Sequence, residues 1–125
     1  MIVLVTGGAR SGKSTFAENL YKGKKDVVYI ATSKAFDEEM KERIKLHKES
    51  RPDYWRTYEG NYSLTDALGE ERNYLLDCIT VLTSNIMFDM TKDVEYISYK
   101  LQKEVEEKVC GELYNLIKAV EEKDF

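Results

Sequence analysis

The chain has 125 residues, enough for one domain with a buried core, so we treat residues 1–125 as a single domain. Its 23 acidic residues outnumber its 19 basic ones, for a net charge of −4, which argues against a nucleic-acid-binding surface. No apolar stretch approaches the length of a membrane span. Cys78 and Cys110 show no metal-type spacing, so we expect a reduced, cytoplasmic compartment and an inert, buried thiol at Cys78.

The first predicted element is a strand over residues 2–5, Ile-Val-Leu-Val, which we expect at the centre of a parallel sheet because it is apolar on both faces. Directly behind it comes the pattern Gly-x-x-x-x-Gly-Lys-Ser, typical of a phosphate-binding loop. Glycines let several backbone N–H groups face one concavity, and the following helix presents its positive dipole end there. The predicted phosphate-binding residues are Gly7, Gly8, Ala9, Arg10, Ser11, Gly12, Lys13 and Ser14.

Two side chains of this loop have predicted roles. The Lys13 ammonium would contact the β- and γ-phosphates, and the Ser14 hydroxyl would ligate Mg²⁺. The alternative is a glycine turn that binds no ligand. The strand and helix around the loop favour a nucleoside triphosphate site.

The remaining elements follow from hydrophobic periodicity and from helix-breaking residues. In the first half of the chain we expect a helix from residue 13 that stops at Gly23, a strand over 27–31, a charged helix over 37–50 ended by Pro52, and a short strand over 54–58. In the second half we expect a strand over 74–76 ending in Asp77, a helix over 79–90, a loop over 91–93 and a long amphipathic helix over 95–122. Gly111 interrupts the last helix and would mark a bend or a close contact.

Strands that alternate with helices predict an α/β fold of the P-loop NTPase type, with a mostly parallel sheet and flanking helices. Only three or four strands can be counted, and nucleotide-binding sheets usually need more. The last helix ends where another strand would begin. We therefore expect the sheet to be incomplete and the C-terminal part to be missing.

Asp77 comes at the carboxyl end of a buried strand, where P-loop proteins keep the carboxylate that orients Mg²⁺. A solvated aspartate at a strand end is the alternative interpretation.

The single histidine, His47, lies between Arg43 and Arg51 at a spacing of four, so all three share one helix face. Two guanidiniums beside an imidazole suit phosphate groups and would keep the imidazole neutral, the form that attacks phosphorus. The residues alone leave three roles open for His47: nucleophile, phosphate contact or plain surface residue.

Several segments recur together in one enzyme family. They are residues 6–14, Tyr-Ile-Ala-Thr-Ser at 29–33, residues 37–44, His47-Lys48, the block from Arg51 to Glu59, and Leu-Asp-Cys-Ile-Thr at 76–80. The chain from Met1 to about Asn85 resembles the bifunctional adenosylcobinamide kinase / adenosylcobinamide-phosphate guanylyltransferase family of cobalamin biosynthesis. The block from Arg43 to Glu59 is more diagnostic than the P-loop, which many families share.

The resemblance implies two reactions: phosphorylation of adenosylcobinamide, then transfer of GMP from GTP to the new phosphate through a GMP-histidine intermediate. The family's histidine aligns with His47, and the neighbouring position is Leu46 here. Besides the P-loop, the resemblance assigns nucleotide contacts to Ala31, Thr32, Ser33, Lys48, Glu49, Ser50, Arg51, Glu59 and Asp77. Glu59 would accept hydrogen bonds from guanine if it lies near the base, and is otherwise a surface carboxylate.

The resemblance also implies ATP, GTP and Mg²⁺ as cofactors, small-molecule substrates, and a symmetric homo-oligomer such as a trimer, with no nucleic acid or membrane partner. The family's Asn-Glu-Val-Gly segment has no match here, which bears on whether this polypeptide is active. Two other interpretations therefore stay open: another small-molecule P-loop kinase, and an inactive nucleotide-binding fragment.

Overall fold

Three parallel strands form the centre of the molecule. The computed structural model of the chain describes residues 1–33 and 38–123, apart from the His47 side chain. The strands are β1 (Val27–Ala31), β2 (Arg56–Glu59) and β3 (Asn73–Asp77), in the order β2-β1-β3. Ala31 pairs with Glu59 on one side and with Asp77 on the other. The register therefore brings the predicted site residues of three separate segments to one edge of the sheet.

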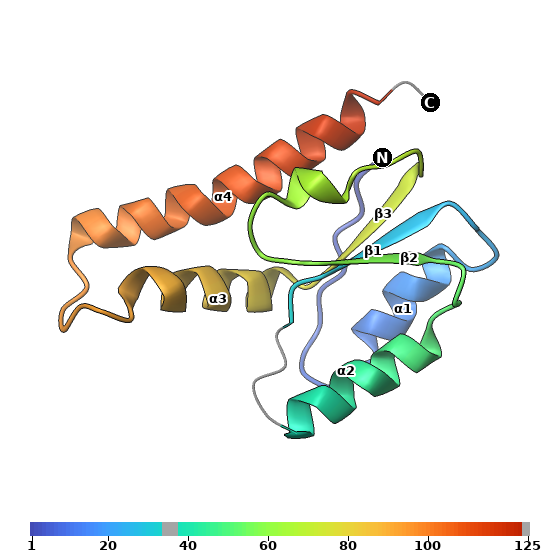
Figure 1. Cartoon of the computed structure of the whole chain (residues 1–125), viewed down its shortest axis with the longest axis horizontal. Coiled ribbons are helices and arrows are strands. Elements are labelled where there is room, and N and C mark those ends of the chain that lie inside the picture. Colours follow the sequence, from blue (N-terminus) through green and yellow to red (C-terminus); the bar gives the residue numbers. More distant parts are fainter. Residues whose placement is uncertain (34–37, 124–125) are drawn as a thin grey trace.

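Helices cover both faces of this open sheet, as expected for an α/β fold. They are α1 (Lys13–Leu20), α2 (Glu38–Ser50), the short 3-10 helix η1 (Leu64–Ala67), α3 (Ile79–Thr91) and α4 (Tyr99–Glu121). Figure 1 shows α4 and η1 on one side of the sheet and α1 and α2 on the other, with the α3–α4 hairpin projecting past the carboxyl ends of the strands. Within the described ranges, no helix has both the length and the apolar character to cross a bilayer.

The main core lies between the sheet and η1, α3 and α4. Val28 and Ile30 point from β1 into this core and are fully buried, together with Leu64, Leu82 and Ile86. Burial of each such aliphatic side chain contributes about 1.5–3 kcal/mol. Because side chains alternate along a strand, Tyr29, which lies between Val28 and Ile30, faces the opposite side of the sheet, towards α1 and α2.

Most predicted elements are confirmed. The strand over 27–31 has the predicted bounds, β2 begins two residues later than expected, and β3 extends one residue further at each end. The helix at residue 13 ends at Leu20, and the chain then turns through Gly23, whose φ is +86°. Residue 37, the predicted start of the second helix, lies outside the described residues, and α2 is described from Glu38.

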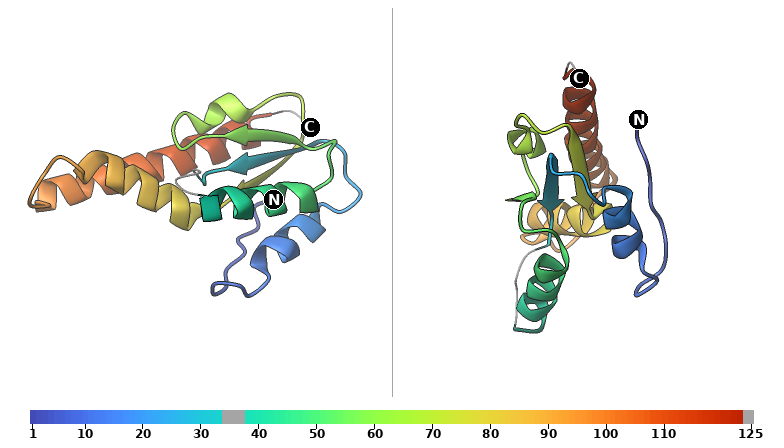
Figure 2. Two further views of the ribbon diagram at one scale, coloured as in Figure 1. Left: turned by 60° about the horizontal axis from the view of Figure 1, so that its bottom comes forward. Right: turned by 90° about the vertical axis from the view of Figure 1, so that its right-hand side faces the viewer.

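The predicted strand over residues 2–5 is wrong. Ile2, Val3 and Leu4 are 60%, 54% and 71% exposed, and the segment belongs to no strand. Figure 2 shows it as an irregular trace on the α1 side of the sheet. A strand forms only where a neighbour supplies a hydrogen-bonding ladder, and in the described part of the chain no strand pairs with the outer edge of β3. An apolar run therefore did not suffice to place a central strand.

The last helix also differs from its prediction. It begins at Tyr99 rather than near residue 95, because the Ser98 hydroxyl caps it by accepting the Leu101 N–H at 3.1 Å. Gly111 neither interrupts the helix nor allows a close contact, since a Cβ there would meet open space. The preceding helix, α3, includes residue 91, so the predicted loop over 91–93 begins one residue later.

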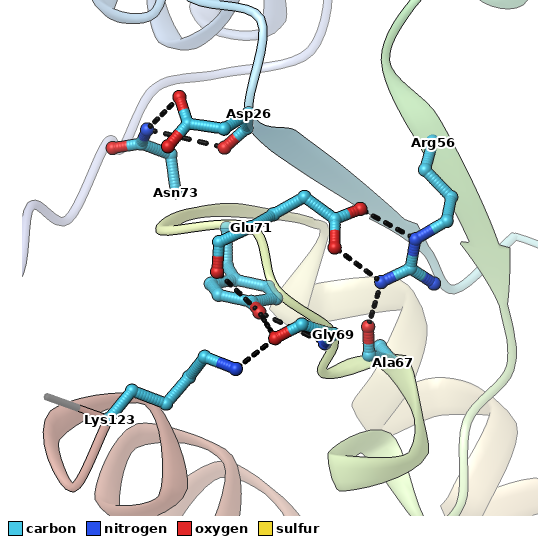
Figure 3. Close-up of polar contacts among 8 residues, drawn as sticks. Asp26, Arg56, Ala67, Gly69, Glu71, Asn73 and Lys123 are labelled. Atoms are coloured by element: carbon cyan, nitrogen blue, oxygen red, sulfur yellow. Dashed lines mark hydrogen bonds and ion pairs between the residues drawn. The ribbon is translucent and has the colours of Figure 1, made fainter. Parts of the chain in front are cut away.

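The amino ends of the strands are joined by paired polar groups. The Arg56 guanidinium at the start of β2 donates to both Glu71 carboxylate oxygens, at 2.6 and 3.2 Å, and to the Ala67 carbonyl at 2.6 Å. The Asn73 amide at the start of β3 donates to the Asp26 carboxylate at 3.0 Å. Figure 3 shows these contacts around one loop between η1 and β3. The loop is thereby fixed to the sheet.

Candidate functional site

The predicted phosphate-binding loop leads directly into α1. The Ser11 N–H donates to the Gly8 carbonyl at 3.2 Å, which closes a turn, and the Phe16 N–H donates to the Gly12 carbonyl at 2.9 Å, which starts the helix. Gly12 is the residue before the helix and has φ +89°, a left-handed conformation that costs other residues about 1–2 kcal/mol. The glycine of the motif is thus required by the backbone.

The side chains of this loop with predicted roles lie at the start of the helix. Lys13 and Ser14 are the first two residues of α1, and both are partly exposed. The Lys13 ammonium lies back over the loop and donates to the Gly8 carbonyl at 3.3 Å. Arg10 also has a positive φ, of 59°, which is uncommon for a non-glycine residue and concentrates at functional loops. The arrangement offers backbone N–H groups, a helix N-terminus and the Lys13 ammonium to an anion.

A pocket of about 450 Å³ lies at the carboxyl ends of β1 and β2. It is lined by Ala31, Ser33, Ile44, Glu59, Gly60, Asn61 and Tyr62. Three of these, Ala31, Ser33 and Glu59, are predicted nucleotide contacts from two different segments. Glu59 is exposed, and its carboxylate has no hydrogen-bond or ion-pair partner within the described ranges, so it can accept hydrogen bonds from a ligand.

Asp77 ends β3 beside the end of β1, and its side chain has a specific partner. The Tyr29 hydroxyl donates to the Asp77 carboxylate. The Arg51 guanidinium, just after α2, stacks on the Tyr29 ring with its carbon 3.6 Å from the ring centroid. Burial, together with this carboxylate, raises the pKa of Tyr29 far above its usual range, so the hydroxyl stays a donor.

Thr32 contributes to the framework beneath the site. It is fully buried, and its hydroxyl accepts the Cys78 N–H at 2.9 Å while lying 2.9 Å from the Cys78 carbonyl. The buried Asn85 amide donates to the Thr32 carbonyl at 2.9 Å and to the Asn61 side chain at 3.3 Å. These bonds hold the ends of β1 and β3 and one wall of the pocket together. Cys78 is half-buried and caps α3, since its sulfur accepts the Val81 N–H at 3.5 Å.

The remaining predicted residues lie on or beside α2. His47 lies in this helix, but its side chain is outside the described part of the structure. Arg43, Lys48, Glu49 and Ser50 are exposed on the helix, and Arg51 is half-buried against the sheet. The nucleotide contacts of Lys48, Glu49 and Ser50 stay predictions.

A metal site built by the protein alone is not found among the described residues, because no three Asp, Glu, His or Cys side chains gather there. Mg²⁺ rarely needs such a cluster, since one or two carboxylates and the phosphates of the substrate usually hold it. Ser14 and Asp77 offer a hydroxyl and a carboxylate, which are hard oxygen ligands. In chemical type these residues fit a magnesium ion that would arrive with a nucleotide, and their role as its ligands stays a prediction.

Sequence reasoning missed four pocket residues, Ile44, Gly60, Asn61 and Tyr62, and it missed Tyr29. The last three pocket residues directly follow β2, so their place after a strand end was a usable signal. Tyr29 gave no such signal. Its contact with Asp77 depends on the pairing of β1 with β3, in which Ala31 pairs with Asp77, 46 positions further along the chain.

Comparison with known proteins gives one family. A family model described as "Cobinamide kinase / cobinamide phosphate guanyltransferase" matches residues 3–124. A bifunctional adenosylcobalamin biosynthesis protein of Escherichia coli (strain K12) is 40% identical over 123 residues, which cover 95% of this chain and 67% of the relative. The proteins of the same description from Salmonella typhimurium and Pseudomonas aeruginosa are 47% and 44% identical, over 70% and 67% of this chain. The matches span 51% of these last two relatives, so the chain corresponds to about half to two thirds of their length.

Proposed function

We propose that the chain binds nucleoside triphosphates at the carboxyl edge of its sheet and serves both reactions of its family. The chain belongs to the cobinamide kinase / cobinamide phosphate guanyltransferase family. The observation that carries the proposal is the pocket at that edge, which collects Ala31, Ser33 and Glu59. The P-loop, which leads into α1, would supply the phosphate-binding half of such a site. ATP or GTP would be the phosphoryl donor, and small molecules the acceptors.

In the kinase step, the cobinamide hydroxyl oxygen forms a bond to the γ-phosphorus, and the bond to the β,γ-bridging oxygen breaks. Lys13 and the loop N–H groups act by holding the charge on the phosphate oxygens. Ser14 and Asp77 would hold Mg²⁺, which would further neutralise this charge. The proton of the hydroxyl leaves to solvent.

In the guanylyl-transfer step, a neutral His47 nitrogen attacks the α-phosphorus of GTP. A phosphorus–nitrogen bond forms, and pyrophosphate leaves. A cobinamide phosphate oxygen then attacks the same phosphorus, which releases the imidazole and completes the transfer of GMP. Support for this role is the place of His47, the chain's only histidine, one helical turn before the half-buried Arg51.

One labelling experiment tests this function. The protein is incubated with Mg²⁺ and GTP labelled at the α-phosphate, and compared with His47→Ala and with the matched control Leu46→Ala, an exposed neighbour on the same helix. We expect acid-labile, alkali-stable label on the wild type and on the control, and none on His47→Ala.

Two other outcomes would replace the proposal. In a parallel incubation with nucleotide labelled at the γ-phosphate, transfer of label to an acceptor, without any α-label on the protein, would indicate a plain small-molecule kinase. Nucleotide binding without either transfer would indicate a nucleotide-binding domain that catalyses neither reaction.

A further inference from the structure

Tyr29 is buried in the middle of β1, on the face opposite the main core. It has 4% of its surface exposed, and yet it carries a polar group. A buried hydroxyl needs a partner, because leaving it unbonded costs about 1–3 kcal/mol. The partner here is a side chain at the edge of the sheet rather than a nearby backbone carbonyl.

The hydroxyl and the ring of Tyr29 contact two different predicted site residues. The hydroxyl donates to one carboxylate oxygen, Oδ2, of Asp77, while the Arg51 guanidinium lies on the ring face at 3.6 Å. Arg51, just after α2, and Asp77, at the end of β3, are 26 residues apart in sequence. One side chain thus touches both the predicted magnesium ligand and the predicted phosphate contact.

We propose that Tyr29 is a positioning residue of the nucleotide site. Its hydroxyl occupies one oxygen of Asp77 and turns the other towards Mg²⁺, and its ring holds the Arg51 guanidinium in a fixed place for a phosphate. This inference rests on the proposed function, since it assumes a magnesium–nucleotide complex at this edge.

The chemistry of the two contacts explains why they would act separately. A hydrogen bond to a metal-ligating carboxylate fixes its orientation, and the loss of such a partner commonly costs 10–100-fold in metal affinity, as an order of magnitude. An aromatic face attracts a guanidinium whether or not it carries a hydroxyl. Tyr29→Phe therefore removes the first contact alone, and Tyr29→Leu removes both.

The test measures binding of a fluorescent GTP analogue to the full chain, in EDTA and during a titration with Mg²⁺. For Tyr29→Phe we expect the Mg²⁺ concentration at half-maximal effect to rise about tenfold, with binding in EDTA unchanged. For Tyr29→Leu we expect the same rise and weaker binding in EDTA. The matched control is Tyr21→Phe, which removes another partly buried hydroxyl that donates to β3, at the Tyr74 carbonyl, 3.3 Å away; it should change neither quantity.

Two further measurements separate positioning from a general loss of stability. In an Asp77→Asn background, Tyr29→Phe should add no further shift to the Mg²⁺ midpoint, because the two changes act through one contact. In NMR spectra of the free protein, the Arg51 side-chain protons should show an upfield ring-current shift in the wild type and in Tyr29→Phe, and lose it in Tyr29→Leu.

An unchanged Mg²⁺ midpoint in Tyr29→Phe, or equal effects of Tyr29→Phe and Tyr21→Phe, would overturn the role of the hydroxyl. Additive effects in the Asp77→Asn background would overturn it too. A wild-type chain that binds no GTP analogue in any condition would instead overturn the proposed function, and this inference with it.

Discussion

At the amino ends of the strands, charged and polar side chains bind one another, as Arg56 binds Glu71 and Asn73 binds Asp26. At the carboxyl ends, the Glu59 carboxylate faces a pocket, and a buried tyrosine fixes Asp77. Residues of the same chemical types thus stabilise the fold at one edge and are left available for a ligand at the other. This difference separates stability from function along the length of a single short sheet.

The largest effect should come from Lys13→Ala. Removing one group that stabilises developing charge on phosphate commonly lowers the rate by about 10²–10³-fold. We therefore expect the rates of both the kinase and the guanylyl-transfer reactions to fall by this factor. The exposed Lys25, just before β1 at the amino edge, gives the control Lys25→Ala, which should keep both activities. Retention of either activity in Lys13→Ala would show that two separate triphosphate sites exist.

Glu59→Gln, at the carboxyl edge, should change the base preference alone. A hydrogen bond to a charged group contributes about 1.5–3 kcal/mol, so we expect binding of a fluorescent GTP analogue to weaken at least tenfold, while the ATP analogue binds as before. Glu70→Gln, an exposed carboxylate near the amino edge, is the matched control. Equal losses for both nucleotides would remove Glu59 from the guanine contact.

Arg56→Ala should affect stability and leave nucleotide binding unchanged. The substitution leaves the Ala67 carbonyl and the Glu71 carboxylate without their donor, and at this partly exposed site we expect a loss of about 1 kcal/mol in the free energy of unfolding by urea. Arg56→Lys, which keeps the charge but not the planar group, should fall between. A loss of GTP-analogue binding in folded Arg56→Ala would break the separation of the two edges.

The smallest effect is a pH dependence at the amino edge. The hydrogen bond from Arg56 holds the pKa of Glu71 below its usual range. A carboxyl whose pKa is lower in the folded state stabilises the fold above its unfolded pKa, and this contribution is lost as the pH falls through the folded value. Stability should therefore decline less steeply from about pH 5 to pH 3 in Glu71→Gln than in the wild type, as followed by urea unfolding at each pH. Parallel profiles would contradict the assignment.

The elements that the sequence predicted well are those with local causes. The P-loop glycines dictate a turn and a helix start, and Gly12 takes the left-handed conformation that the motif requires. The strand over 27–31 consists of hydrophobic residues, counting Tyr29, and is buried on both faces. The fold class and the edge at which site residues gather follow from such signals.

The elements that the sequence did not predict depend on partners far along the chain. Residues 2–5 are apolar, but no local pattern says whether a neighbouring strand is present to pair with them. The Glu112 carboxylate lies on a helix with many charges, and yet it is buried, because it accepts the Ser63 and Leu64 N–H groups at 3.0 and 3.1 Å. Tertiary hydrogen bonds of this kind, like the one from Tyr29, leave no mark in residue spacing.

The most direct test is an NMR titration of the isotope-labelled chain with Mg²⁺ and GTP. If the carboxyl edge is the triphosphate site, the amide signals of Gly8, Gly12, Ala31 and Ser33 should shift, while those of Leu68 and Asn73 at the amino edge stay in place. Shifts confined to the amino edge, or an unchanged spectrum at the glycine loop, would contradict the account.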